Sequence, residues 1–494
     1  MEEENVRIKL ERHIWPDERA NRRRKKIFVS TVIIAIVLSF GIGWLFGTFL
    51  QTPITINNSG KYTRLDAIIE TLANQWYFGK DIEDIQEWLL TNAINGMIDL
   101  NGDIHTSYMT PEEVRSFNES IDMGFVGIGV QYYMSADGYP VVERVFKNSP
   151  AEEFGVMPGD IIFTVDGVDI QGFETEEIAS RVKGEAGTKV VIEFIRAGAI
   201  VKIEIIRGLV KNSAFGQILS GNIGYLEIYQ FGSSTTQEVV GYLNDMKDRN
   251  VSKLIIDLRD NGGGYLNTLI GISSLLLPKD TVVIRQEYKD GKTEIGKTLG
   301  GQMTNFKDIV ILVNGNTASA SEVLTAALQE QADHIIVVGT QTYGKGTVQI
   351  TRPFADGSAL KFTSAQWKSP NGKAIHGVGI TPDIVIELHP VFYFDKIVLD
   401  EGVTFGFDQV DRSVALAQLA LDFLGYSVDR TDGYFDQSTV DAIIKFRADY
   451  KLEESGRLDK KALQVLSTEV IRYWFTNRSQ LDTQLQKAIE LINE

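Results

Sequence analysis

Residues 309–331 read IVILVNGNTASASEVLTAALQEQ, and residues 340–349 read TQTYGKGTVQ. The apolar run Ile309–Val313 predicts a buried strand, and the small residues after it predict a turn into a helix rich in Ala and Leu. A serine at such a turn lies where backbone N–H groups at the helix start can face a substrate. Lys345, between two glycines, supplies the other half of a Ser–Lys pair, a known variant of the serine nucleophile and its base. A capped helix followed by a glycine turn explains the same residues without any chemistry.

Composition limits the class of protein. A chain of 494 residues is too long for one hydrophobic core and predicts roughly three or four domains. The net charge of −17 argues against nucleic acid as a partner, because phosphate binding needs a basic face. There is no cysteine and there are only five scattered histidines, so disulfides and thiolate metal sites are excluded and a zinc enzyme is disfavoured. We expect neither a metal nor a cofactor.

The first fifty residues predict a membrane anchor. Residues 1–26 end in a cluster of arginines and lysines, and residues 27–50 carry no charge. A helix of these 24 residues is about 36 Å long, enough to cross a hydrocarbon core of about 30 Å. A cleaved signal peptide is the alternative, but the segment ends GWLFGTFL without a small-residue cleavage site. Basic residues favour the cytoplasmic side, so we expect a cytoplasmic tail at 1–26, a transmembrane helix at 27–50 and the rest outside the cell.

Residues 51–118 predict a short linker and an N-terminal helical region, with two helices within 64–95. The stretch DIHTSYMTPEE follows at 103–113. Asp99, Asn101 and Asp103 have the spacing of a calcium loop, but no glutamate stands at its twelfth position, so we reject a calcium site. We expect His105 to hold a turn.

Residues 119–208 change to short alternating strands, expected at 124–132, 140–145, 161–165, 190–195 and 201–206. With SPAEEFGVMPGDIIFTVDG at 149–167, the pattern resembles the PDZ family. The resemblance implies a loop whose N–H groups bind a peptide's terminal carboxylate, beside which the peptide adds as a strand. That loop would be Phe125, Val126, Gly127, Ile128 and Gly129. A small β-domain used only as a spacer is the alternative.

Residues 209–390 alternate apolar strands with helices, which is typical of an α/β layer. Within them, KLIIDLRDNGGGYL at 253–266 predicts a strand that runs into a glycine loop. The loop lacks the GxGxxG and GK[ST] patterns of phosphate sites. We therefore expect its N–H groups to hold an oxyanion.

The series DIHTSYMTPEE, DLRDNGGG, NTASASE, TYGKGTVQ and PNGKAIHGVGITPD resembles the carboxyl-terminal processing peptidases, or tail-specific proteases, over residues 61–390. The resemblance implies a serine endopeptidase with Ser319 as nucleophile, Lys345 as base and Gln349 as the residue that positions the lysine. It implies oxyanion donors at the backbone N–H groups of Ala320 and Gly263. Ser321 is interpreted as a helix-start residue.

Two features qualify this resemblance. A lysine of ordinary pKa is protonated at pH 7 and cannot take a proton from serine. Lowering its pKa by about 3 units costs roughly 4 kcal/mol, which burial can supply, so we expect Lys345 in an apolar pocket with its head group bonded to Gln349.

In some members an arginine of the PDZ turn signals peptide occupancy to the active site. The matching position here is Lys183, with Arg181 two residues earlier, and lysine lacks the planar fork of arginine.

Residues 391–466 predict two or three helices joined by Asp–Gly turns. The motifs LGY at 424–426, DGYF at 432–435 and TVDAIIKF at 439–446 resemble the peptidoglycan-binding domain family, which implies peptidoglycan as a partner. Arg447 and Lys461 depart from the usual glutamine and threonine, and a packing or dimerisation role is the alternative. Residues 467–494 predict one amphipathic helix, a cap or a homodimer contact.

The resulting hypothesis is a multidomain α+β chain. It has one N-terminal transmembrane helix, a PDZ β-domain before an α/β Ser–Lys protease core, and a small all-α C-terminal domain. The expected function is a membrane-anchored bacterial serine endopeptidase that captures the C-terminal tails of proteins or peptides outside the cell. A wall-associated PDZ scaffold with an idle core is the main alternative. A peptidoglycan hydrolase is a third, without a metal set or carboxylate pair in its favour.

Overall fold

The computed structural model describes residues 63–494 apart from 123, 136, 211 and 212. In that part of the chain, no helix has both the length and the hydropathy needed to cross a membrane. The expected cytoplasmic tail and transmembrane helix, residues 1–50, lie outside the described residues.

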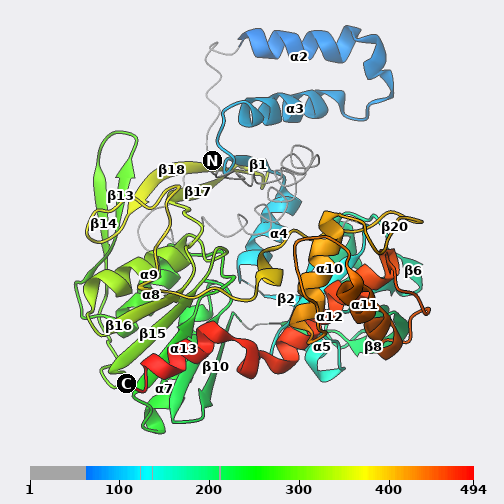
Figure 1. Cartoon of the computed structure of the whole chain (residues 1–494). Coiled ribbons are helices and arrows are strands. Elements are labelled where there is room, and N and C mark those ends of the chain that lie inside the picture. Colours follow the sequence, from blue (N-terminus) through cyan, green and yellow to red (C-terminus); the bar gives the residue numbers. More distant parts are fainter. Residues whose placement is uncertain (1–62, 123, 136, 211–212) are drawn as a thin grey trace, which may run out of the picture.

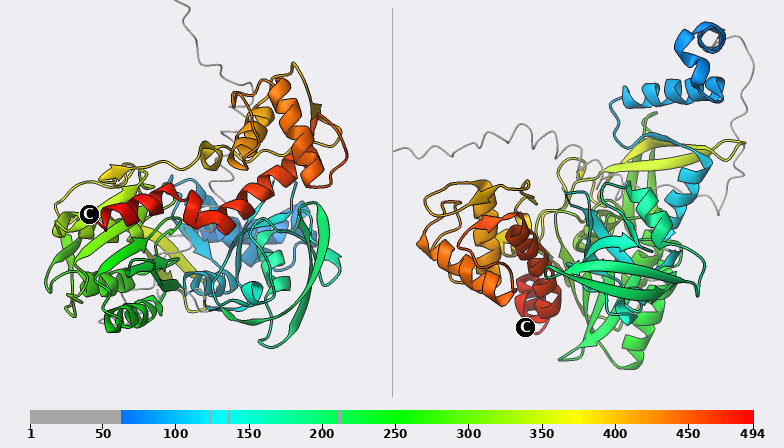
Figure 2. Two further views of the ribbon diagram at one scale, coloured as in Figure 1. Left: turned by 60° about the horizontal axis from the view of Figure 1, so that its bottom comes forward. Right: turned by 90° about the vertical axis from the view of Figure 1, so that its right-hand side faces the viewer.

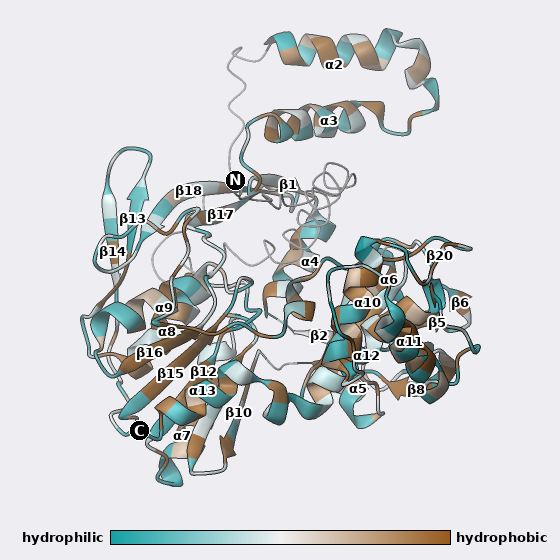
Figure 3. Ribbon diagram, viewed as in Figure 1, coloured by the Kyte–Doolittle hydropathy of each residue, from teal (hydrophilic) through white to brown (hydrophobic). Residues whose placement is uncertain are grey.

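A six-stranded sheet forms the centre of the largest domain, as the alternation of strands and helices predicts (Figure 1). Its strands, in spatial order, are β10 (Ala214–Leu219), β11 (Ile223–Ile228), β12 (Lys253–Asp257), β15 (Asp308–Val313), β16 (Ile335–Gly339) and β19 (Ile384–Val385). Neighbours are parallel except β10 and β11. The strands are apolar on both faces, which Figure 3 shows in brown along β15 and β16. The α/β expectation is confirmed.

Different helices cover the two faces of this sheet. One face packs, through residues such as Leu254 and Ile256, against α7 (Thr235–Asp248), α8 (Leu266–Leu276) and α9 (Ala320–Gln331). The other face, through residues such as Ile255, packs against Ala488 and Ile492 near the C-terminus. Because successive side chains of a strand point to opposite faces, each strand supplies both cores.

A second, five-stranded sheet lies beside α9 and brings distant segments together. Its path is β1 (Ser107–Met109), β18 (Ala359–Lys368), β13 (Val282–Tyr288) and β14 (Thr293–Lys297), and β17 (Thr347–Pro353) also pairs with β18. The antiparallel register places Gln349 of β17 opposite Thr363 of β18, and Ser107 of β1 opposite Lys361. The DIHTSYM segment and the strand that follows GKG thereby lie on opposite edges of β18.

The PDZ domain is a separate antiparallel sheet in the order β3, β4, β5, β7, β8, with β6 on β5. Its elements are β3 (Val130–Met134), β4 (Pro140–Val145), α5 (Pro150–Glu153), β5 (Ile161–Val165), β6 (Val168–Asp169), α6 (Thr175–Val182), β7 (Lys189–Arg196) and β8 (Ala199–Ile206). The predicted strands 140–145 and 161–165 are confirmed residue for residue, and the last two extend by one or two residues. The strand expected at 124–132 is divided into β2 (Phe125–Gly127) and β3. β3 is an edge strand of this sheet.

The helical parts lie at the two ends of the described chain. The predicted N-terminal pair is α2 (Thr63–Gln75) and α3 (Ile85–Asp99), joined by η1 (Tyr77–Asp81), and it projects from the rest in Figure 1. α4 (Pro111–Asp122) follows β1. The C-terminal domain contains η2 (Pro390–Tyr393), β20 (Thr404–Phe405), α10 (Arg412–Phe423), α11 (Gln437–Asp449), β21 (Leu458–Asp459) and the start of α12 (Lys460–Leu481).

The prediction of one helix over 467–494 is wrong. α12 begins at Lys460 and runs out of the C-terminal domain toward the large sheet, where α13 (Thr483–Leu491) follows (Figure 2). The break is at Asp482, whose φ and ψ of −77° and 84° are not helical. Its carboxylate accepts a hydrogen bond from Leu485 N–H at 2.9 Å and so caps α13. The break turns the apolar side of α13 onto the sheet.

Candidate active site

Ser319 occupies the sharp turn between β15 and α9. Its φ and ψ are +66° and −116°, a conformation that costs a residue with a Cβ on the order of 1–3 kcal/mol. The side chain is buried, and its Oγ makes no hydrogen bond to any described residue. Ser321, in contrast, lies in the first turn of α9 and donates from Oγ to the Asn261 carbonyl at 3.0 Å. The strained strand-to-helix turn resembles a nucleophile elbow and distinguishes Ser319 from Ser321.

Lys345 lies in an almost fully buried position, with 2% of its surface exposed. Burial, followed by the charge of Lys361, lowers the pKa of Lys345 from 10.5 to about 7. A pKa near neutrality makes the neutral amine, the state that a base requires, accessible near pH 7. Gly346 permits this loop, because a Cβ there would lie 2.4 Å from His376 N. Lys345 is buried, as expected, although charged groups such as Lys361 and Asp103 act on it.

Glu322 holds the serine and lysine segments together, a role that the sequence interpretation missed. Its buried carboxylate accepts hydrogen bonds from the N–H groups of Ser319 at 2.7 Å and Lys345 at 2.8 Å. It also accepts from Gly344 N–H and the Thr342 hydroxyl, both at 2.6 Å. Burial raises the pKa of Glu322 above its ordinary value, although these hydrogen bonds act to lower it. The spacing of Ser319 and Glu322, that of a capping box, was the available signal.

Gln349 differs from the expectation in one respect. Its Nε2 donates to the Thr347 hydroxyl at 2.9 Å and to the Thr363 hydroxyl at 3.2 Å. Its Oε1 is buried and accepts no hydrogen bond from a described residue. The expected bond between Lys345 and Gln349 is therefore not formed in this conformation, because Gln349 Oε1, the atom that would accept from the lysine, has no hydrogen-bond partner among the described residues.

The two expected oxyanion donors differ in their surroundings. Ala320 is the first residue of α9, so its N–H belongs to the unsatisfied start of a helix. The Gly263 N–H instead donates to Asn261 Oδ1 at 2.8 Å. Asn261 is fixed because its Nδ2 donates to the Ile228 carbonyl at 2.6 Å, which turns Oδ1 back onto the glycine loop. The Gly263 N–H therefore already has an acceptor in this conformation. The Asn261 backbone carbonyl accepts from Ala318 N–H at 3.0 Å, and this bond joins the glycine loop to the serine turn.

The predicted PDZ loop is partly a strand. Phe125, Val126 and Gly127 form β2 (Phe125–Gly127), which pairs antiparallel with β9 (Gly208–Val210), so that stretch is not an open loop. Ile128 and Gly129 follow as the turn into β3. Gly129 has φ of +86°, and a Cβ there would lie 2.4 Å from Ser149 Cβ, so only glycine fits.

The two residues proposed as a switch have different partners. Lys183 pairs with Glu119 of α4 at 3.2 Å, whereas Arg181 pairs with Glu177 of its own helix at 3.3 Å and lies over the Phe173 ring. These contacts lie within the PDZ domain or reach α4, and they do not involve the serine or lysine segment. Of these two residues, Lys183 contacts an element outside the PDZ domain.

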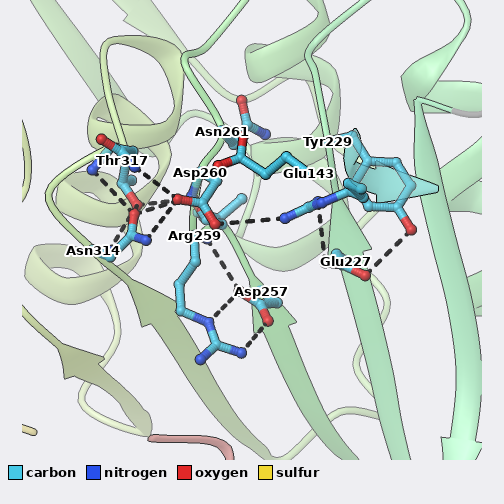
Figure 4. A network of polar contacts seen from close by, with 12 residues as sticks. Glu143, Glu227, Tyr229, Asp257, Arg259, Asp260, Asn261, Asn314 and Thr317 are labelled. Carbon is cyan, nitrogen blue, oxygen red and sulfur yellow. Dashed lines mark hydrogen bonds and ion pairs between the residues drawn. The ribbon is translucent and has the colours of Figure 1, made fainter. Parts of the chain in front are cut away.

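Arg144 of β4 makes the contact between the PDZ domain and the glycine loop. Its guanidinium pairs with Glu227 at 3.3 Å and with Asp260 at 3.5 Å. Asp260 Oδ1 in turn accepts from the amides of Asn314 and Asn316, both at 2.9 Å, on the loop before Ser319 (Figure 4). A continuous polar network therefore joins the PDZ domain to the serine segment.

The DLR segment before the glycine loop binds the C-terminal helices. Arg259 contacts the carboxylates of Asp257 at 2.6 Å and Asp482 at 2.7 Å, and all three side chains are buried (Figure 4 shows the first pair). Arg478 adds an ion pair to Asp257 at 2.9 Å. Nothing in the sequence motifs signalled that these residues meet.

Comparison with known proteins agrees with this architecture. The model of peptidase family S41 matches residues 222–386, the PDZ domain model 141–196, and the peptidoglycan binding domain model 411–466. The carboxy-terminal processing protease CtpA of Bacillus subtilis is 32% identical over 477 residues, which cover 96% of this chain and 99% of that protein. The chain belongs to the S41 family of carboxy-terminal processing proteases.

Two further proteins are similar along much of the chain. A probable CtpA-like serine protease of Staphylococcus saprophyticus is 31% identical over 465 residues, 94% of this chain and 91% of that protein. The solved photosystem II D1 C-terminal processing protease is 24% identical and covers 66% of this chain and 92% of that one, with a TM-score of 0.45. The three matched ranges lie within the predicted segments 209–390, 119–208 and 391–466.

Proposed function

We propose that this member of the S41 family is a membrane-anchored serine endopeptidase whose catalytic part acts outside a bacterial cell. Ser319 attacks the scissile carbonyl, and the neutral amine of Lys345 takes the serine proton and returns it to the leaving amine. Gln349 orients the lysine. The N–H groups of Ala320 and Gly263 stabilise the oxyanion, the latter after its bond to Asn261 opens.

One observation carries the proposal: the buried Lys345, whose loop shares the Glu322 carboxylate with the strained Ser319. A lysine needs no histidine partner if burial keeps its pKa near neutrality, as it does here at about 7. Among the described residues there is no cluster of three or more potential metal ligands. The proposed chemistry uses side chains and backbone N–H groups of this chain only.

The test is cleavage of an unfolded protein by the purified full-length chain. Ser319→Ala and Lys345→Ala are each expected to abolish turnover. Ser321→Ala is the matched control, two residues along the same turn, and is expected to keep activity within about tenfold, the cost of one buried hydrogen bond. A serine-reactive probe should label the wild type but not Ser319→Ala. Unchanged cleavage by Ser319→Ala contradicts the assignment, and failure of the probe to label the wild type favours an idle scaffold.

Capture of substrate C-termini by the PDZ domain is the second part of the proposal. The edge strand β3 offers its free side for an added strand, and the turn at Ile128 and Gly129 leads directly into it. A peptide with a free C-terminal carboxylate is expected to bind more tightly than the same peptide with a C-terminal amide. Equal affinities of the two peptides would remove the carboxylate from the recognition.

The C-terminal domain is proposed to hold the enzyme near peptidoglycan. The two residues that depart from the domain's usual pattern make internal contacts: Arg447 pairs with Asp459 at 2.9 Å, and Lys461 donates to the Gly198 carbonyl of the PDZ domain at 3.2 Å. These contacts explain both departures without involving a wall-facing surface. Co-sedimentation of the full chain with purified cell wall tests the binding, and absence of co-sedimentation contradicts it.

The anchor and the oligomeric state complete the proposal. Carbonate extraction of membranes is expected to leave the chain in the pellet, and release would contradict a transmembrane anchor at 27–50.

The N-terminal helical pair, α2 and α3, exposes Tyr77 and Phe78 in the segment that joins the two helices, and each side chain is more than two-thirds accessible. This exposure supports a homodimer through the helical pair. Analytical ultracentrifugation in detergent should show a dimer that Tyr77→Ser and Phe78→Ser together weaken.

A further inference from the structure

The DIHTSYM segment takes no part in the proposed chemistry, yet the fold places it against the active site. β1 pairs with β18, and β18 pairs with β17, which carries Gln349. The turn before β1 is tightly built: the Asp103 carboxylate accepts from His105 N–H at 3.0 Å and from the Thr106 hydroxyl at 2.6 Å. Burial and then the charge of Lys345 lower the pKa of His105 to about 4, so this histidine is neutral beside the catalytic lysine.

Thr363 connects this turn to Gln349. Burial raises the pKa of Asp103, but hydrogen bonds from the Thr106 and Thr363 hydroxyls and the His105 N–H, with the electrostatic effect of His105, together bring it below its ordinary value, so the group is an ionised acceptor. A threonine hydroxyl has a single proton. With that proton directed at the Asp103 carboxylate, Thr363 Oγ1 is left to accept, and it accepts from Gln349 Nε2 at 3.2 Å.

The amide of Gln349 then has only one permitted orientation. Its second Nε2 hydrogen goes to the Thr347 hydroxyl at 2.9 Å, and the buried Oε1 accepts from no described residue. A buried acceptor left open costs free energy unless a donor reaches it. We propose that Asp103, acting through Thr363, is a positioning residue that holds the Gln349 amide with its oxygen open to receive an N–H of Lys345. This inference rests on the proposed function.

The orientation matters because the two ends of an amide have opposite effects on a lysine base. An oxygen facing Lys345 accepts an N–H of the amine and leaves the nitrogen lone pair for the serine proton. A flipped amide would donate its own N–H to that lone pair and compete with the serine. The flipped amide would also disfavour the charged ammonium, so the acidic limb of the pH–rate profile would move to lower pH while kcat falls. The other charged groups acting on Lys345 are Lys361, Glu322 and Asp103 itself.

The test compares Thr363→Val, which has the shape of threonine without the hydroxyl, with Thr363→Ser, which keeps the hydroxyl, in the full-length chain. Thr363→Val is expected to lower kcat at least about tenfold with KM changed less than about twofold, and to move the acidic limb down by about one pH unit. Thr363→Ser is expected to keep the wild-type limb and kcat within about threefold. Asp103→Asn, at a half-exposed turn, is a second variant expected to shift the limb in the same direction.

A double variant shows whether Thr363 acts through Gln349. Thr363→Val combined with Gln349→Ala should be no slower than Gln349→Ala alone, because the relay then has nothing to orient. Additive losses, or a Thr363→Val profile equal to that of Thr363→Ser, overturn the inference even if Ser319→Ala is inactive. Undiminished cleavage by Ser319→Ala would instead overturn the proposed function, and the inference with it.

Discussion

Replacing Lys345 by methionine should abolish activity and yet stabilise the protein at neutral pH. In the folded chain, burial lowers the pKa of Lys345 to about 7, whereas the unfolded chain has the ordinary value of 10.5. Between these values the unfolded state binds more protons, so the lysine destabilises the fold and the penalty shrinks as pH rises. Below about pH 7 the penalty is constant, and above about pH 10.5 it vanishes.

The size of the effect follows from the two pKa values. Linkage gives a penalty of about 4 kcal/mol at pH 7 and about 2 kcal/mol at pH 9. Methionine has a similar length, carries no charge and suits an apolar pocket. The stability advantage of Lys345→Met over the wild type should therefore fall by about 2 kcal/mol between pH 7 and pH 9. Lys361, with a pKa of about 8, titrates in both proteins and cancels to first order.

Urea unfolding of both proteins at the two pH values measures this difference. Tryptophan fluorescence is suitable because the buried Trp367 donates its indole N–H to the Lys345 carbonyl at 2.8 Å and so reports on this loop. Lys289→Met, at an exposed position after β13, is the control and should show no pH-dependent advantage. An advantage of Lys345→Met that is equal at pH 7 and pH 9 would refute the lowered pKa and with it the neutral base.

Three further outcomes are expected. When kcat/KM is measured against pH, it should fall about tenfold per pH unit below a midpoint near pH 7, because protonated Lys345 cannot act as base. A kcat/KM that stays constant down to pH 5 contradicts this. Asp482→Ala should cost about 3 kcal/mol or more in unfolding free energy, since it leaves Arg259 buried without this partner and uncaps α13. Asp482→Asn keeps a capping oxygen and should cost less; equal losses would assign the effect to the lost ion pair with Arg259 and not to the cap. Gly346→Ala should destabilise by about 1–3 kcal/mol and lower kcat, as its Cβ meets His376 N at 2.4 Å; wild-type stability and kcat would show that the loop relaxes freely.

Much of the site could be predicted from local sequence, for identifiable reasons. The strand-to-helix turn at Ser319 and the glycines around Lys345 are short-range patterns, and the structure shows a strained serine and a buried lysine there. The serine–glutamate spacing of a capping box was also visible, but not that Glu322 would bind the lysine loop. That contact joins residues 23 positions apart and depends on how β16 returns beside β15.

Other parts of the site had no local signal at all. Gly263 N–H donates to the Asn261 side chain because that side chain is itself held by a hydrogen bond to β11. The oxygen of Gln349 is left open because threonines on two strands accept from its amide nitrogen. Lys183 was expected to connect the PDZ domain to the site, but Arg144, for which the sequence carried no signal, contacts the glycine loop, because the PDZ domain meets that loop through β4.

By itself, the sequence determined the residue types, the order of the domains and the periodicity of strands and helices, because those depend on neighbours within a few positions. It also placed Ser319 at a turn and Lys345 between glycines. Only the tertiary structure decided the pKa of Lys345, the partners of Gln349 and the break at Asp482. Burial, a hydrogen-bond partner and an ion pair across 223 residues are properties of packed neighbours, which no local pattern encodes.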